Sequence, residues 1–266
     1  TLPKDGSYEP STFRSLLASL WQAMSKGSLD HLFGAQEHIS LELVGQSGQL
    51  QFQIWAASQA LARLVRAQLR GHFPDVGIVS AESQVPQASA IAYTELRLGL
   101  ERERPLRSFP RAEADPMRGL LAALADLAAD AWGLLQILAR PLLHPGFDTL
   151  SFEIILRLAA SGATPSLART RLYALAAGFG PFGAENILRP GRVQGNAGRA
   201  GQLLATRRWP LLRLHRVVLT VEELGAIYHL PEARDIRHLP LSFTGARRLP
   251  PPSLPDAGSV RVGLVP

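Results

Sequence analysis

The sequence has no cysteine, which excludes both a disulfide framework and a thiolate metal site. It has no apolar run of about 18 residues, so no membrane-spanning helix is expected. The pattern GxxxxGK[ST], whose backbone and lysine hold nucleotide phosphates, is also missing. These residues are therefore not expected to hold ATP, Mg²⁺ or another cofactor, or to act as an enzyme by themselves.

The composition is that of a folded protein. Of 266 residues, 46% are hydrophobic and 19% are charged, enough for one large domain or two ordinary ones. The absence of cysteine fits a reducing cytoplasm. The sequence begins at Thr1 rather than Met and shows no signal peptide, so we expect a piece of a longer protein.

The net charge of +6 is concentrated near the C-terminus. Residues 1–188 hold 16 Lys or Arg against 17 Asp or Glu, a net charge of −1. Residues 189–248 hold 11 against 4, a net charge of +7. Such an excess can neutralise nucleic-acid phosphates. Only two of the 28 basic residues are lysines, so a biased genome is the alternative explanation for the arginines.

The N-terminal third predicts a helix followed by a small β-β-α-β unit. Residues 1–30 are a polar lead-in and a helix over 13–24 with apolar side chains at helical spacing. Residues 31–90 alternate as a hairpin does around a Gly45–Gly48 turn, and an amphipathic pattern follows. The expected elements of this unit are strands over 39–44 and 50–54, a helix over 57–72 and a strand over 76–78.

Residues 91–190 predict a ferredoxin-like β-α-β-β-α-β unit packed with the smaller one, and hence an α+β fold. Asp115 followed by Pro116, and Thr164 followed by Pro165, are helix starts with proline at the first position. The expected order is strand 93–101, helix 115–130, strand 132–139, strand 149–159, helix 164–179 and strand 186–189, with Glu101 and Glu103 on a solvated edge.

The last part, residues 191–248, is expected to be a basic loop and a capped helix, and residues 249–266 a proline-rich linker. Thr220 and Glu223 have capping-box spacing, and Glu222 adds charge to the first turn. Pro231 cannot continue the helix. An ordinary capped surface helix is the alternative interpretation.

The string LTVEELGAIYHLP, residues 219–231, before a proline-rich stretch resembles the end of the N-terminal domain of type IV secretion and conjugation ATPases of the HerA/FtsK-like superfamily. That family has the pattern L-(S/T)-x-E-E-L-A-x-(L/I)-(W/Y)-H-(L/F)-P, and this chain has Gly225 where alanine is frequent. Residues 39–76 and 152–179 also resemble family segments, so the resemblance spans 13–255. The motif residues are Thr220, Glu222, Glu223, Tyr228, His229 and Pro231.

The resemblance implies a non-catalytic N-terminal domain that docks a DNA-translocating motor to channel proteins or to neighbouring subunits of a ring oligomer. ATP and Mg²⁺ would belong to a motor domain beyond the proline-rich linker. The longer protein would work in the cytoplasm at the inner face of the cell membrane. DNA contact by this domain is a further expectation.

Two rival functions stay open: a stand-alone nucleic-acid-binding protein using residues 189–248, and a small enzyme on a ferredoxin-like scaffold. The candidate DNA or partner contacts surround Thr206–Pro210, where basic residues flank a tryptophan, although a solvated loop is the alternative. These candidates are Arg207, Arg208, Arg213 and Arg216.

Other candidate sites have structural interpretations. Gly195–Gly201 is expected to be a flexible surface loop rather than a phosphate loop, because no strand leads into it. His215, His229 and His238 lack zinc-site spacing. His229 is expected to pack at the helix end against unpaired carbonyls.

Overall fold

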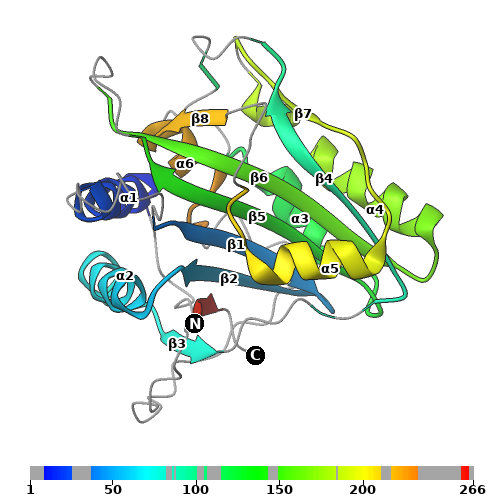
Figure 1. Ribbon diagram of the computed structural model, residues 1–266, viewed down its shortest axis with the longest axis horizontal. Helices are drawn as coiled ribbons and strands as arrows, with labels where there is room; N and C mark the ends of the chain where they lie inside the picture. The colour runs from blue at the N-terminus through cyan, green and yellow to red at the C-terminus, as the bar shows by residue number, and fades with distance from the viewer. Residues whose placement is uncertain are drawn as a thin grey trace.

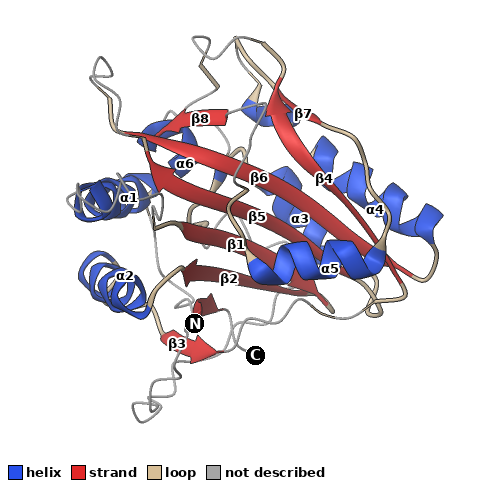
Figure 2. Ribbon diagram, in the orientation of Figure 1, coloured by secondary structure: helices blue, strands red, loops and turns tan. Residues whose placement is uncertain are grey.

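The structure is a computed structural model of the α+β class, as predicted (Figures 1 and 2). The sheet runs in the order β3-β9-β2-β1-β5-β6-β4-β7, and β8 also pairs with β6. Every strand pair is antiparallel. The structure describes residues 9–25, 37–81, 86, 88–100, 105–106, 115–142, 149–183, 185–210, 217–232 and 259–263.

The strands follow from the alternating and continuous apolar runs of the sequence. Ser47 and Gly48, both at positive φ, make the tight turn between the first two. The strands are β1 Ile39–Gln46, β2 Gln49–Ala56, β3 Ile78–Ala81, β4 Ala90–Leu98, β5 Trp132–Pro141, β6 Ser151–Gly162, β7 Leu188–Pro190, β8 Val217–Thr220 and β9 Ser259–Gly263.

Side-chain caps define the starts of several helices. Ser58 and Thr164 accept backbone N–H bonds from Leu61 and Leu167, and the proline after Thr164 fits the first helical turn. The helices are α1 Pro10–Ser25, α2 Gln59–His72, α3 Arg118–Ala125, α4 Pro165–Ala177, α5 Ala197–Thr206 and α6 Val221–Ile227, with a 3₁₀ turn at Gly180–Phe182.

The two predicted units share one sheet, because β1 of the first pairs along its length with β5 of the second. The β-β-α-β unit, which was expected to pack against the ferredoxin-like unit, is instead joined to it strand to strand within the sheet. Within the second unit the order is β5-β6-β4-β7, which the ferredoxin-like interpretation allows.

Several boundaries differ from the prediction. Helix α3 ends at Ala125 instead of about residue 130. Residues 195–201, expected to be a loop, contain the start of helix α5 with Asn196 as its N-cap. The expected linker 249–266 contains β9, which pairs with β2 and β3. Glu101, Glu103 and the prolines of 249–255 lie outside the described residues.

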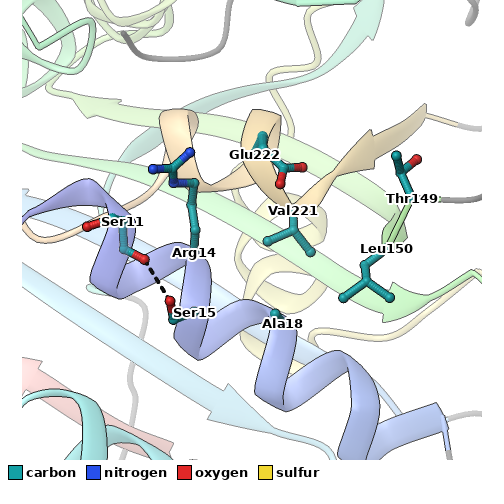
Figure 3. Close-up of a pocket in the computed structure, with 8 residues that line it drawn as sticks. All are labelled: Ser11, Arg14, Ser15, Ala18, Thr149, Leu150, Val221 and Glu222. Atoms are coloured by element: carbon teal, nitrogen blue, oxygen red, sulfur yellow. Dashed lines mark hydrogen bonds between the residues drawn. The ribbon is translucent and has the colours of Figure 1, made fainter. Parts of the chain in front are cut away.

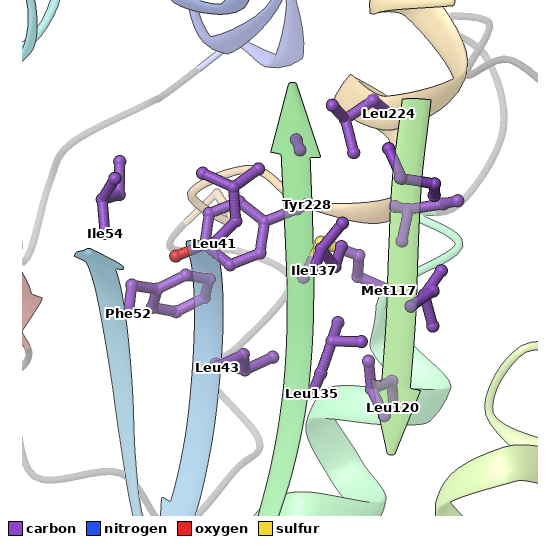
Figure 4. Packing of buried hydrophobic residues seen from close by; sticks show 14 of the residues in the cluster. Leu41, Leu43, Phe52, Ile54, Met117, Leu120, Leu135, Ile137, Leu224 and Tyr228 are labelled. Carbon is purple, nitrogen blue, oxygen red and sulfur yellow. The ribbon is translucent and has the colours of Figure 1, made fainter. Parts of the chain in front are cut away.

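The two faces of the sheet differ in what covers them. Residues of α1, α2, α3, α4 and α6 pack in the main core on one face, part of which Figure 4 shows. Helix α5 crosses the other face, where Ala200 and Leu204 join a smaller cluster with Tyr93, Trp132 and Leu134 (Figure 1). The polar and charged side chains described below lie mostly on this second face.

Candidate functional site

The capped-helix motif has the predicted capping box. The Thr220 hydroxyl accepts a 3.2 Å bond from the Glu223 N–H, and the Glu223 carboxylate accepts a 2.8 Å bond from the Thr220 N–H. The same carboxylate accepts a 2.8 Å bond from the backbone N–H of Leu106. Glu223 therefore caps α6 and also anchors the residues 105–106 that precede α3. Glu222 is exposed.

The motif is a core element rather than a surface helix. Every residue from Val221 to Pro231 is buried except Glu222. The Tyr228 ring packs 5.4 Å from Phe13 of α1 and 5.8 Å from Phe52 of β2, centroid to centroid. Its hydroxyl lies 3.1 Å and 3.0 Å from the carbonyl oxygens of Glu42 and Gln53 and donates to them. Burial raises the pKa of Tyr228 well above its ordinary value.

His229 meets the end of α6 as predicted. Its Nδ1 lies 2.9 Å from the carbonyl oxygen of Gly225, and because a carbonyl only accepts, Nδ1 donates. Its Nε2 lies 3.1 Å from Oδ2 of Asp115, whose Oδ1 accepts from the N–H of Met117. Pro231 is also buried. The motif thus links α6 to the residues that start α3.

A groove of about 450 Å³ separates α1 from the start of α6 (Figure 3). Arg14 closes one side: a Cβ added to Gly225 would lie 2.6 Å from Arg14 Cγ, so α1 approaches α6 at the position where the resembled family often has alanine. The polar groups that line the groove are hydroxyls, one guanidinium and one carboxylate. They suit a polar ligand, but they include no nucleophile–base pair. The lining residues are Ser11, Arg14, Ser15, Ala18, Thr149, Leu150, Val221 and Glu222.

Arg207 contradicts the surface-contact prediction. Its side chain is 3% exposed and its guanidinium donates to both oxygens of Glu42, at 2.6 Å and 2.9 Å. Its backbone is left-handed, with φ 49°, at the end of α5, a position that glycine commonly fills. The buried ion pair offsets the strain of this conformation. Arg208 is exposed, as a surface contact requires, and its contact with DNA or a partner stays a prediction. Outside the described residues lie Arg213, Arg216, His215 and His238.

Glu42 belongs to a row of polar residues that crosses the sheet and that the sequence did not predict. Each residue of the row is directly opposite the next on the neighbouring strand. Gln136 donates 3.0 Å to Glu42 and 2.9 Å to the carbonyl of Leu204 in α5. The row, Gln53–Glu42–Gln136–Arg157–Glu95, therefore holds α5 against the sheet.

Arg157 is the buried cation of this row. It donates 3.1 Å to Gln136 and 3.3 Å to Glu95. Burial lowers the pKa of Arg157, and the carboxylate of Glu95 opposes that effect. The signal in the sequence was Gln136 and Arg157, each flanked by apolar residues within its strand. Pairing them requires the register, which the sequence does not state.

A cluster of aromatic and cationic groups follows Arg207. The Arg140 guanidinium lies 4.3 Å from the centroid of Trp209 and also binds Glu153 at 2.7 Å. The His38 ring lies 5.7 Å from Trp209, and its Nε2 is 2.8 Å from the carbonyl oxygen of Arg207. Burial lowers the pKa of His38. Because Arg140 covers a face of Trp209, that ring is a poor platform for stacking a base.

Among the residues that the structure describes, no group of three or more His, Cys, Asp or Glu side chains could hold a metal ion. No helix in that part of the chain is long and apolar enough to cross a membrane.

A sequence profile described as "Domain of unknown function (DUF8128)" matches residues 2–145, more than half of the chain. The chain belongs to this family. In this DUF8128 member the match includes α1, the β1–β2 hairpin, α2, α3 and β5, whereas the capped-helix motif lies beyond it. No curated protein and no solved structure matches the chain.

Proposed function

We propose that this chain is the N-terminal, non-catalytic domain of a type IV secretion or conjugative DNA-translocating ATPase. The observation that carries the proposal is the string of residues 219–231, which resembles the segment that ends such a domain. In the fold, this string includes the end of β8, helix α6 and the Tyr228–His229 pair, and it contacts β1, β2 and the residues before α3. A string with this structural role suits a domain that positions a motor.

The domain would dock the motor to channel proteins or to neighbouring subunits of a ring. In this proposal the longer protein works in the cytoplasm at the inner membrane face, and ATP and Mg²⁺ belong to the motor. The continuous sheet and the internally bonded polar row support a positioning role, because the buried charges bind one another rather than face a cavity. The sequence has no GxxxxGK[ST] loop for nucleotide phosphates.

The test compares this chain with the longer product of its own reading frame. We expect a GxxxxGK[ST] motif soon after residue 266, and ATP hydrolysis by the longer protein but not by residues 1–266. A matched Lys→Ala variant in that motif controls for contaminating ATPases. A natural stop codon close to residue 266, or hydrolysis by the purified 266-residue chain, would refute the proposal.

The alternative, a stand-alone nucleic-acid-binding protein, is favoured by one observation. Within the basic segment, Arg189, Arg192, Arg199 and Arg208 are exposed. A stop codon near residue 266 together with salt-dependent DNA binding would support this alternative over the motor-domain proposal.

A further inference from the structure

Two arginines lie directly opposite each other at the edge of the sheet. Arg97 of β4 pairs in register with Arg189 of β7, so both side chains extend on the same face. Like charges at such a position destabilise a strand pair. Both residues are exposed, and within the described residues neither forms an ion pair.

Three more exposed arginines follow the same edge. Arg192 lies in the segment that leads from β7 to α5, and Arg199 lies in the first turn of α5. Arg169 of α4 reaches the same segment, because its Nη2 lies 3.8 Å from the position of a Cβ built on Gly195. We call Arg97, Arg169, Arg189, Arg192 and Arg199 the arginine rim.

The rim is held by the sheet. The Gln194 backbone forms a two-bond bridge with Tyr93 of β4, at 2.9 Å for each bond, and the Tyr93 hydroxyl donates 2.7 Å to the Gln194 side chain. The N–H of Gly191 donates to the carbonyl of Glu95, which fixes the other end of the segment. The arginines therefore project from an ordered backbone, which lowers the entropy cost of binding.

The neighbouring carboxylates leave the rim charges largely unopposed. Glu95, two residues before Arg97, already binds Arg157 at 3.3 Å. Glu185 is exposed four residues before Arg189 and forms no ion pair among the described residues. Among the residues that the structure describes, Glu185 is thus the one neighbouring carboxylate of the five cations that forms no ion pair.

We propose that the arginine rim binds the phosphodiester backbone of duplex DNA. The five residues from Tyr93 to Arg97 span about 13 Å, over which a duplex presents about eight phosphate charges. The surface of a folded acidic protein rarely presents negative charges as densely as a duplex does, because like charges side by side destabilise the fold. Guanidinium groups and the N–H groups of a helix start are common phosphate ligands.

Duplex DNA fits better than a single strand. Binding of a single strand relies on aromatic rings that stack on successive bases. Among the described residues, Tyr173 is the one large exposed aromatic, while Trp209 is covered by Arg140. The rim therefore contacts backbone rather than bases, and its affinity should not depend on sequence. This inference does not require the proposed function, since a stand-alone protein would bind in the same way.

The experiment measures fluorescence anisotropy of a labelled duplex of about 20 base pairs with the 266-residue chain, between about 50 and 200 mM salt. The slope of log K against log salt should be about −4.5 for five contacts. Arg97→Gln/Arg189→Gln should weaken binding by about 50-fold at 0.1 M salt and make the slope shallower by about 2. A second double variant, Arg192→Gln/Arg199→Gln, should weaken binding to the same extent, and it provides the test if the first variant folds poorly.

The matched control is Arg63→Gln/Arg70→Gln on the exposed side of α2, which removes the same charge away from the rim. This control should change affinity by less than about threefold. An equal loss in the control would overturn the proposal, as would no binding by the wild-type chain. Tighter binding to single-stranded DNA or to polyglutamate than to the duplex would overturn it as well, the latter in favour of an acidic protein partner.

Discussion

Removing the Arg207 side chain should severely destabilise the fold, because Glu42 would remain as a buried, unpaired charge. Glu42 is 2% exposed and accepts 2.6 Å and 2.9 Å bonds from Arg207, together with bonds from Ser40 and Gln136. In Arg207→Met only the last two remain. Breaking one side of such a pair costs about 3–5 kcal/mol, a large part of a typical total of about 5–15 kcal/mol.

The measurement is the free energy of unfolding from urea denaturation, followed by circular dichroism. Arg208→Met, one residue along and exposed, should change it by less than about 0.5 kcal/mol. Glu42→Gln/Arg207→Met should be more stable than Arg207→Met alone, because no unpaired carboxylate is left. The reasoning is wrong if Arg207→Met loses less than about 1 kcal/mol or if the double variant is the less stable of the two.

Three further predictions concern α6, its contact with α1, and pH. Glu223→Gln should lower the free energy of unfolding by about 1–2 kcal/mol, because an amide keeps only one of the two oxygens that accept from the Thr220 and Leu106 N–H groups. Glu222→Gln should be nearly neutral, and equal losses in urea denaturation would contradict this. Gly225→Ala should destabilise by about 1 kcal/mol because of its overlap with Arg14, and should become stabilising in an Arg14→Ala background; an unchanged effect there would exclude the overlap. Because the folded pKa of His38 is lowered, its contribution to stability is present above the unfolded pKa of about 6.5 and is lost as pH falls through the folded pKa. His38→Gln should therefore flatten the plot of unfolding free energy against pH below about pH 6.5. An unaltered slope in that plot would count against this.

The sequence predicted elements whose signals are local. The hairpin alternation, the paired cap and proline at Thr164–Pro165, and the Thr220–Glu223 capping box are confirmed. Each depends on residues a few positions apart, where propensity and hydrogen-bond geometry act directly.

Features that depend on distant partners were missed. Helix α5 carries Gly198 and Gly201, which disfavour a helix, and it is supported by Ala200 and Leu204 packing on the sheet. The partner of Arg207 is Glu42, 165 residues away, so the charge pattern suggested a surface instead. The sequence alone does not distinguish a buried arginine from an exposed one.

The position of β9 has a consequence for biosynthesis. Among the described strands, β3 pairs with β9 alone, and β9 also covers the edge of β2. About 180 residues separate β3 from β9, so at about 5–20 residues per second a ribosome needs roughly 10–35 s to supply the partner. Throughout that interval the nascent chain exposes an unpaired strand edge. During this time aggregation through the edge competes with folding, and chaperones that bind the chain protect it.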